Sequence, residues 1–134
     1  MRLNRDVCLV GGGPLGGFGL TADADAHIYL IDCGTELALM DCGMGTPAGM
    51  ERVLANIRQD GYDPNRVTRL FLTHYHTDHA GGAARYRERF GVTVTASRLA
   101  QAALESADSA VTGLAAAQQV GIFPSDYIPR TSVK

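Results

Sequence analysis

Three of the four histidines of the chain lie within residues 74–79, together with an aspartate. They are His74, His76 and His79, and Asp78 lies between the last two. Zinc and related first-row metals bind imidazole nitrogens and carboxylate oxygens, and a catalytic site leaves one position open for water. Such an ion lowers the pKa of its bound water to about 7 and polarises a carbonyl or phosphoryl oxygen. This spacing favours a hydrolytic metal centre over three surface histidines beside a helix-capping aspartate.

The histidines end an apolar run, residues 66–74, that is typical of a β-strand. If the chain stays extended there, His74 and His76 point to the same side, because side chains alternate along extended backbone. Gly81 and Gly82 follow, and glycine has no Cβ to block a tight loop that runs into a helix. We therefore expect the end of this strand to bring two imidazoles to one ion.

Apolar runs and helical spacing predict the elements that hold this turn. Further strands are expected at residues 7–10, 27–32, 36–41 and 92–96, of which the second and third form a hairpin. Helices are expected from Pro47 until Gly61, with Thr46 as N-cap, and at 83–90, 98–106 and 109–120, with Gly91 and Ser97 as caps. This order predicts an α/β domain, a mixed sheet with helices on one face.

The overall composition is that of a small globular domain. The 134 residues are 46% hydrophobic and 19% charged, and 14 acidic and 12 basic side chains give a net charge of -2. No charge run indicates nucleic acid or anionic lipid as a partner, and no stretch reaches the roughly 20 apolar residues that span a bilayer. We therefore expect a cytoplasmic protein with a small-molecule substrate and no membrane partner, and no nucleic-acid partner is evident.

The cysteines are Cys8, Cys33 and Cys42, an odd number without CxxC spacing. Each lies in or beside an apolar run that is expected to form a strand. This position predicts buried free thiols, in preference to disulfides or a zinc knuckle.

The run from His74 to His79 resembles the HxHxDH signature of the metallo-β-lactamase-fold hydrolases. The glycines at 81–82 and the preceding segment IYLIDCGTELALMDCGMG are also similar to that family. The resemblance follows the whole chain in order, and it implies the amino-terminal half of an αββα sandwich. Activity in that family is metal-dependent hydrolysis.

The resemblance also implies roles for individual residues. His74 and His76 would bind a first metal, and Asp78 and His79 a second. The metals would be up to two zinc ions, with iron or manganese possible because the same ligands suit each. Asp78 would in addition be catalytic, since it would orient the attacking hydroxide. Asp41 would help to hold the histidine turn, or would only cap local N–H groups.

Part of the family's site has no counterpart in the sequence. The family adds a third histidine, a bridging aspartate and a last histidine, whereas no histidine follows His79 and Lys134 falls where the next strand is expected. We therefore expect residues 1–134 to form a single, incomplete domain, with weakened metal binding. A second copy or a second chain would supply the missing half. Without it, the leucines at 30, 39, 70 and 72 are expected to form an exposed apolar patch.

Other residues have competing interpretations. His27 is a further metal or substrate ligand, or a partly buried polar side chain at a strand start. Asp108 and Asp126 are extra carboxylates, or ordinary helix-cap and turn residues. Residues 11–16, GGGPLG, match GxGxxG after a strand, but a dinucleotide site needs a helix directly behind this motif. A flexible loop beside the active site is the better interpretation.

Two functions follow from the sequence. The first is a metal-dependent hydrolase that uses a metal-bound hydroxide on an ester, thioester, lactone, β-lactam or phosphodiester bond, and that needs the missing half. The second is a truncated, non-catalytic half-domain that acts as a structural or interaction module and binds metal weakly. Metal content and turnover separate the two.

Overall fold

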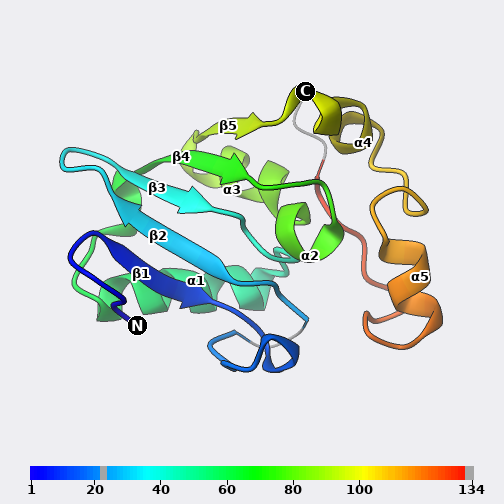
Figure 1. Ribbon diagram of the computed structural model, residues 1–134, viewed down its shortest axis with the longest axis horizontal. Coiled ribbons are helices and arrows are strands. Elements are labelled where there is room, and N and C mark those ends of the chain that lie inside the picture. Colours follow the sequence, from blue (N-terminus) through cyan, green and yellow to red (C-terminus); the bar gives the residue numbers. More distant parts are fainter. Residues whose placement is uncertain (22–23, 132–134) are drawn as a thin grey trace.

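A mixed β-sheet organises the chain in the computed structural model, which describes residues 1–21 and 24–131 (Figure 1). Within these residues the sheet has five strands in sequence order, β1 (Val7–Gly11), β2 (Ile28–Asp32), β3 (Leu37–Met40), β4 (Val67–Leu72) and β5 (Thr93–Ala96). β1, β2 and β3 are antiparallel neighbours, whereas β3, β4 and β5 run parallel. The predicted strands and the β2–β3 hairpin are confirmed.

Helices connect the parallel strands and follow the last one. They are α1 (Pro47–Gln59), α2 (Thr77–Ala80), α3 (Ala83–Phe90), α4 (Gln101–Ser106) and α5 (Leu114–Gln119). As predicted, the Thr46 side chain caps α1 by accepting a hydrogen bond from Gly49 N at 3.0 Å, and Gly91 ends α3 with a φ of 65°. In the part of the chain that the structure describes, no helix is long and apolar enough to cross a membrane.

The helix predicted over residues 109–120 is wrong in extent, because α5 begins only at Leu114. Gly113, directly before it, has a φ of 76°, a left-handed conformation that does not continue a right-handed helix. The irregular segment predicted from residue 121 onward is confirmed as far as residue 131, and its last three residues lie outside the described part.

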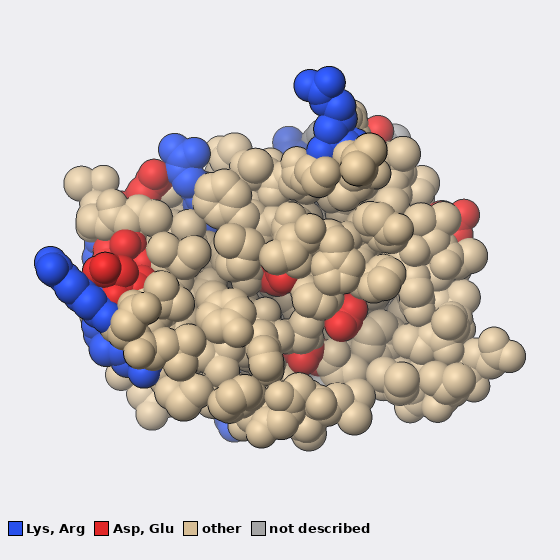
Figure 2. Space-filling model, viewed as in Figure 1, with Lys and Arg blue, Asp and Glu red and all other residues tan. Residues whose placement is uncertain are grey.

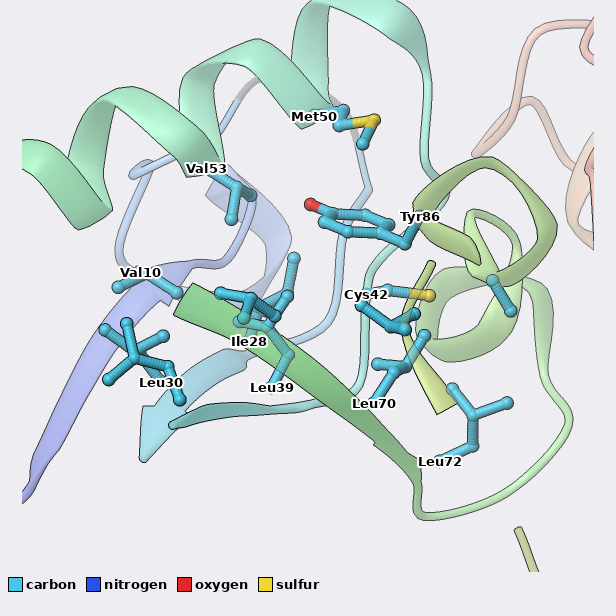
Figure 3. Close-up of a cluster of buried hydrophobic side chains, with 14 of the residues drawn as sticks. Val10, Ile28, Leu30, Leu39, Cys42, Met50, Val53, Leu70, Leu72 and Tyr86 are labelled. Atoms are coloured by element: carbon cyan, nitrogen blue, oxygen red, sulfur yellow. The ribbon is translucent and has the colours of Figure 1, made fainter. Parts of the chain in front are cut away.

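The main core lies between the sheet and the helices α1 and α3. α1 packs on β1, and α3 packs on β4 and β5. Figure 3 shows Leu39 and Leu70 of the sheet in one cluster with Val53 of α1 and Tyr86 of α3. Because burial of apolar surface is the main favourable term in folding, this layer stabilises the chain.

The expectation that Leu30, Leu39, Leu70 and Leu72 form an exposed patch is wrong. All four are at most 5% exposed, because they lie on the face that α1 and α3 cover. Side chains alternate along a strand, so the other face carries their neighbours. That face is turned toward the viewer in Figures 1 and 2. Among the described residues, no helix covers it in Figure 1. Tyr29, Met40 and Phe71 form a cross-strand row on it and are partly exposed.

The thiol prediction is confirmed for two of the cysteines. Cys8 and Cys42 are buried and free. Cys33 is free but exposed, because it lies in the β2–β3 connection, where Gly34 N bonds to the Asp32 carboxylate at 2.9 Å and Cys33 N bonds to Glu36 O at 3.0 Å. Residues in such a tight connection point into solvent.

Candidate metal centre

The three motif histidines come together where β4 ends. After Leu72 the chain runs through residues 73–76, and His76 is the N-cap of the short helix α2. The ring of His74 lies 4.0 Å from the ring of His79 and 4.8 Å from the ring of His76, centroid to centroid. Asp78 Oδ2 is 3.5 Å from His79 Nε2. The structure thus places all four predicted site residues in one turn.

Asp41 fixes this turn to the neighbouring strand. β3 and β4 are parallel, so their carboxyl ends lie at the same edge of the sheet, and Asp41 directly follows β3. Its Oδ1 accepts a hydrogen bond from Thr73 N at 2.8 Å. Its Oδ2 accepts hydrogen bonds from Thr73 Oγ1 at 2.8 Å and from His79 Nδ1 at 2.7 Å. The predicted supporting position of Asp41 is confirmed, and the turn is held by a carboxylate that is 3% exposed.

The charges of the turn shift its histidines in opposite directions. Burial lowers the pKa of His74, and the neighbouring His79 and His76 lower it further. Burial also acts to lower the pKa of His79, but the hydrogen bond that His79 donates to Asp41 and the charges of Asp78 and Asp41 outweigh it and raise that pKa above its ordinary value. His74 therefore favours the neutral form that a metal ligand needs.

The donor chemistry of the turn fits a metal, although the cage is not closed. A ligating histidine typically donates its second N–H to a carboxylate, as His79 does to Asp41. The His74 ring is tilted by 55° against the His79 ring and by 69° against the His76 ring. Among the described residues, no group of three or more His, Cys, Asp or Glu side chains is arranged to enclose an ion. A metal here needs further ligands or a rearrangement of the rings.

The glycines after the motif form the tight turn between α2 and α3, as expected, and they are also needed for close packing. Gly81 and Gly82 have ordinary helical conformations, with φ of -59° and -95°. A Cβ on Gly82 would lie 2.7 Å from the Cα of Gly45, and one on Gly81 would lie 2.8 Å from Met44 O. Both contacts are too short for real atoms, so only glycine lets the loop after Asp41 pack against α2 and α3.

Two hollows flank the turn. A cavity of about 610 Å³ has His76 and Asp78 in its wall. A shallower one of about 420 Å³ is lined by His27, Asp41 and His79, among others. His27 Nε2 bonds to Gly16 O at 3.1 Å, so this ring holds the glycine-rich loop and the structure favours the structural interpretation of His27.

The remaining candidates do not join the turn. Asp108 accepts a hydrogen bond from Ala110 N at 2.8 Å, as expected of a turn residue, and Asp126 lies in an exposed turn. The glycine-rich stretch contains only a 3₁₀ turn, Pro14–Gly16. It lacks the helix that a dinucleotide site requires.

Sequence reasoning missed two threonines that support the turn. Thr73 bonds to Asp41 and lies 3.0 Å from His74 Nδ1. Thr77, which is 1% exposed, donates its N–H and its hydroxyl to Thr112 O, at 3.1 and 3.2 Å. Their partners lie 32 and 35 positions away in the chain, and no local sequence signal announces such bonds.

Known proteins resemble this chain in sequence and fold. A model of the metallo-beta-lactamase superfamily matches residues 23–124. Ribonuclease Z of Pyrococcus furiosus is 36% identical over 69 residues, which are 52% of this chain and 20% of that protein. Atrochrysone carboxyl ACP thioesterase of Aspergillus chevalieri is 31% identical over 78 residues, 58% of this chain and 23% of that protein. A solved B3 metallo-beta-lactamase with an active-site glutamic acid superposes with a TM-score of 0.62 at 32% identity, over 78% of this chain and 34% of that one.

The chain spans about a fifth of the length of these curated relatives and about a third of the solved structure. The match is nevertheless broad on the side of this chain, because the superfamily model covers most of it. The predicted α/β class and the mixed sheet of the metallo-β-lactamase fold are confirmed. The chain belongs to the metallo-beta-lactamase superfamily.

Proposed function

We propose that this chain supplies the amino-terminal part of a metal-dependent hydrolase that cleaves an ester, thioester, lactone, β-lactam or phosphodiester bond. The observation that carries the proposal is the hydrogen bond between the His79 ring and the Asp41 carboxylate, with the rings of His74 and His76 beside it. An imidazole held by a buried carboxylate is oriented to bind metal with its other nitrogen. The relatives are named as a ribonuclease, a thioesterase and a β-lactamase, which supports hydrolysis and leaves the bond open.

Each residue of the turn has a role in this proposal. His74 and His76 hold a first metal, and Asp78 and His79 hold a second, with zinc as the expected metal and iron or manganese as alternatives. When bound, the metal supplies an activated water and a Lewis acid for the scissile bond. Asp41 keeps the ring of His79 in one orientation. Asp78, beside Nε2 of that ring, orients the attacking water.

The remaining ligands would come from a carboxy-terminal half, a second chain or a second copy of this chain. The sheet face with Tyr29, Met40 and Phe71 supports this, because these apolar side chains are only partly buried and large exposed apolar patches are typical of contact sites. The small share of each relative that the chain spans also supports it. The free thiols of the described residues support a reducing, cytoplasmic location.

Metal content and turnover test the proposal, measured on the zinc-loaded chain assembled with the half that supplies its remaining ligands, in the presence and absence of a chelator. The substrates are a 4-nitrophenyl ester, a thioester, a lactone, a chromogenic cephalosporin and bis(4-nitrophenyl) phosphate. His76→Ala and Asp78→Asn are expected to lose bound zinc and turnover, whereas Asp126→Asn in its exposed turn keeps both. Turnover that persists in the presence of the chelator would refute the proposal, and so would turnover by the His76→Ala variant.

A non-catalytic half-domain is the second candidate. It is favoured by one observation: the described residues contain no closed group of three metal-binding side chains. A catalytic zinc site needs three protein ligands beside its water. Substoichiometric zinc without turnover of any substrate, in an assembled protein that is folded by circular dichroism, would decide for this candidate.

A further inference from the structure

The larger of the two hollows is an apolar cavity that ends at the turn of residues 73–79. It lies between α5 with its following loop and the loops at residues 15–16 and 24–26, and its volume is about 610 Å³. His76 and Asp78 belong to its wall, so a molecule in the cavity reaches the turn. A volume of roughly 300–1,000 Å³ is typical of pockets for small molecules.

The chemistry of the wall is one-sided. Apolar side chains dominate it, among them Leu15, Ala117, Val120, Ile122 and Phe123. Leu15 and Val120 are 74% and 69% exposed, which is unfavourable for large apolar side chains unless something covers them. Among the described residues of the wall none is Lys or Arg.

The acidic residues of the cavity wall are Asp25 and Asp78. Asp25 is 5% exposed, and its Oδ1 accepts a hydrogen bond from Met44 N at 2.7 Å. Figure 2 shows acidic side chains near the middle of the visible face, with Lys and Arg at its margins. Polyanions need cationic side chains along their path, so this surface disfavours a nucleic-acid strand.

The wall is fixed to the turn. Thr77, between His76 and Asp78, bonds twice to Thr112 O, just before α5. Gly113 follows, and its position brings the backbone against the His76 ring, since a Cβ there would lie 3.7 Å from Cδ2. Met44, Leu114 and Phe123 form a small second core behind α5. The cavity is therefore formed before a ligand enters, which reduces the entropic cost of binding.

We propose that this cavity binds the uncharged apolar acyl group of a carboxylic ester or thioester, and presents its carbonyl to the turn at His76 and Asp78. The proposal rests on the proposed function and narrows it. In the reaction, the oxygen of water forms a bond to the carbonyl carbon, the C–O or C–S bond breaks, and the alcohol or thiol leaves with a proton from that water. The products are a carboxylic acid and the alcohol or thiol.

Binding is tested separately from catalysis. The chain is titrated with N-phenylhexanamide, an uncleaved acyl probe, in the presence of a chelator, and amide shifts are followed by NMR. The amides of Gly113, Ala116 and Ala117 are expected to shift. Ala116→Phe fills the cavity and should raise Kd at least about tenfold. Ala115→Phe, one position earlier on α5 but outside the wall, should change Kd by less than about twofold.

Three outcomes would overturn the inference: no shift of these amides, equal loss in both phenylalanine variants, or stronger shifts with a short single-stranded RNA. Hydrolysis by the assembled, zinc-loaded protein provides the second measurement, with hexanoyl and acetyl esters and the matching thioesters as substrates. Preference for hexanoyl over acetyl that Ala116→Phe removes supports the cavity, and the ester-to-thioester ratio tells which of the two it serves. Probe binding without metal-dependent turnover refutes only the proposed function, whereas phosphodiester turnover without probe binding refutes only this inference.

Discussion

Leu39 and Met40 are neighbours on β3, yet Leu39 is 0% exposed and Met40 is partly exposed. The same contrast holds between Leu70 and Phe71 on β4. One face of the sheet is closed by α1 and α3, and the other has no helix over it (Figure 1). The closed face lets this chain fold, whereas the open face and the turn at its edge are available for a partner or substrate.

The turn at residues 73–79 rests on a buried carboxylate and presents an exposed side chain. Asp41 is buried and continues the packed strand β3, whereas the side chain of His76 is exposed at the cavity. Rigid scaffolds with functional groups on their connecting loops are a common arrangement. The comparison of the two faces therefore separates residues whose loss unfolds the chain from those whose loss changes only binding.

The largest difference between the faces is expected from truncation on adjacent positions. Leu39→Ala should lower the free energy of unfolding by about 2–5 kcal/mol, because it leaves a cavity in the core. Met40→Ala should cost less than about 1 kcal/mol, because its side chain is partly solvated already. Urea denaturation measures both. Equal costs would mean that the open face is covered, for example by self-association, and analytical ultracentrifugation would then show an oligomer.

A substitution at Asp41 tests whether this buried carboxylate supports metal binding by the turn. Asp41→Asn keeps the size of the side chain but loses the charge that orients His79, so zinc affinity should fall by about 10–100-fold. Asp126→Asn, in its exposed turn, serves as the control. Competition with a chromophoric chelator gives the affinities. An unchanged affinity in Asp41→Asn would show that the buried carboxylate has no part in metal binding.

A smaller effect is expected where the turn meets α5. Thr77→Val removes the hydroxyl that bonds to Thr112 O, which should cost about 0.5–1.5 kcal/mol. Because the bond lies between the turn and the cavity wall, hydrogen exchange should accelerate in α5 and not in α1. Thr95→Val, exposed on β5, is the matched control. Uniform acceleration in all helices would indicate general loss of stability in place of a local loosening.

The smallest effect concerns the thiols. Burial raises the pKa of Cys42 and, with the charge of Asp60, that of Cys8, so both should react slowly with an aromatic disulfide reagent. Cys33 is exposed and should react at once, and Cys33→Ser should change stability by less than about 0.5 kcal/mol. Rapid release of more than one equivalent of thiolate would contradict the buried positions of the other two.

Local patterns predict most of the fold. Helical spacing and a capping threonine are sufficient for α1, and apolar runs are sufficient for the strands. The face that the helices cover was not predictable for Leu39 and Leu70, because alternation separates the two faces without telling which one is packed. The start of α5 was missed because the alanine-rich stretch favours a helix from residue 109. In the structure Gly113 has a left-handed conformation and Thr112 accepts a hydrogen bond from the Thr77 hydroxyl, so α5 begins only after these residues.

The site was predictable only in part. The spacing of His74, His76, Asp78 and His79 identifies the turn, and the resemblance to a known family identifies Asp41. Thr73 and Thr77 were missed because their bonds join segments that are distant in sequence. The packing partner of the glycines at 81–82 was also missed, because it is the loop at residues 44–45, which is distant in sequence.

The two hydrogen bonds that Thr77 donates to the carbonyl of Thr112 have a thermodynamic consequence. Thr77 stands between His76 and Asp78, the proposed ligands of the first and the second metal, and Thr112 lies in the cavity wall against which the acyl group would rest. Ordering of one segment therefore favours ordering of the other. By reciprocity, if occupancy of the cavity changes the affinity for metal by some factor, metal changes the affinity for the cavity's ligand by the same factor. The two hydrogen bonds of the buried Thr77 would then make metal binding and substrate binding cooperative.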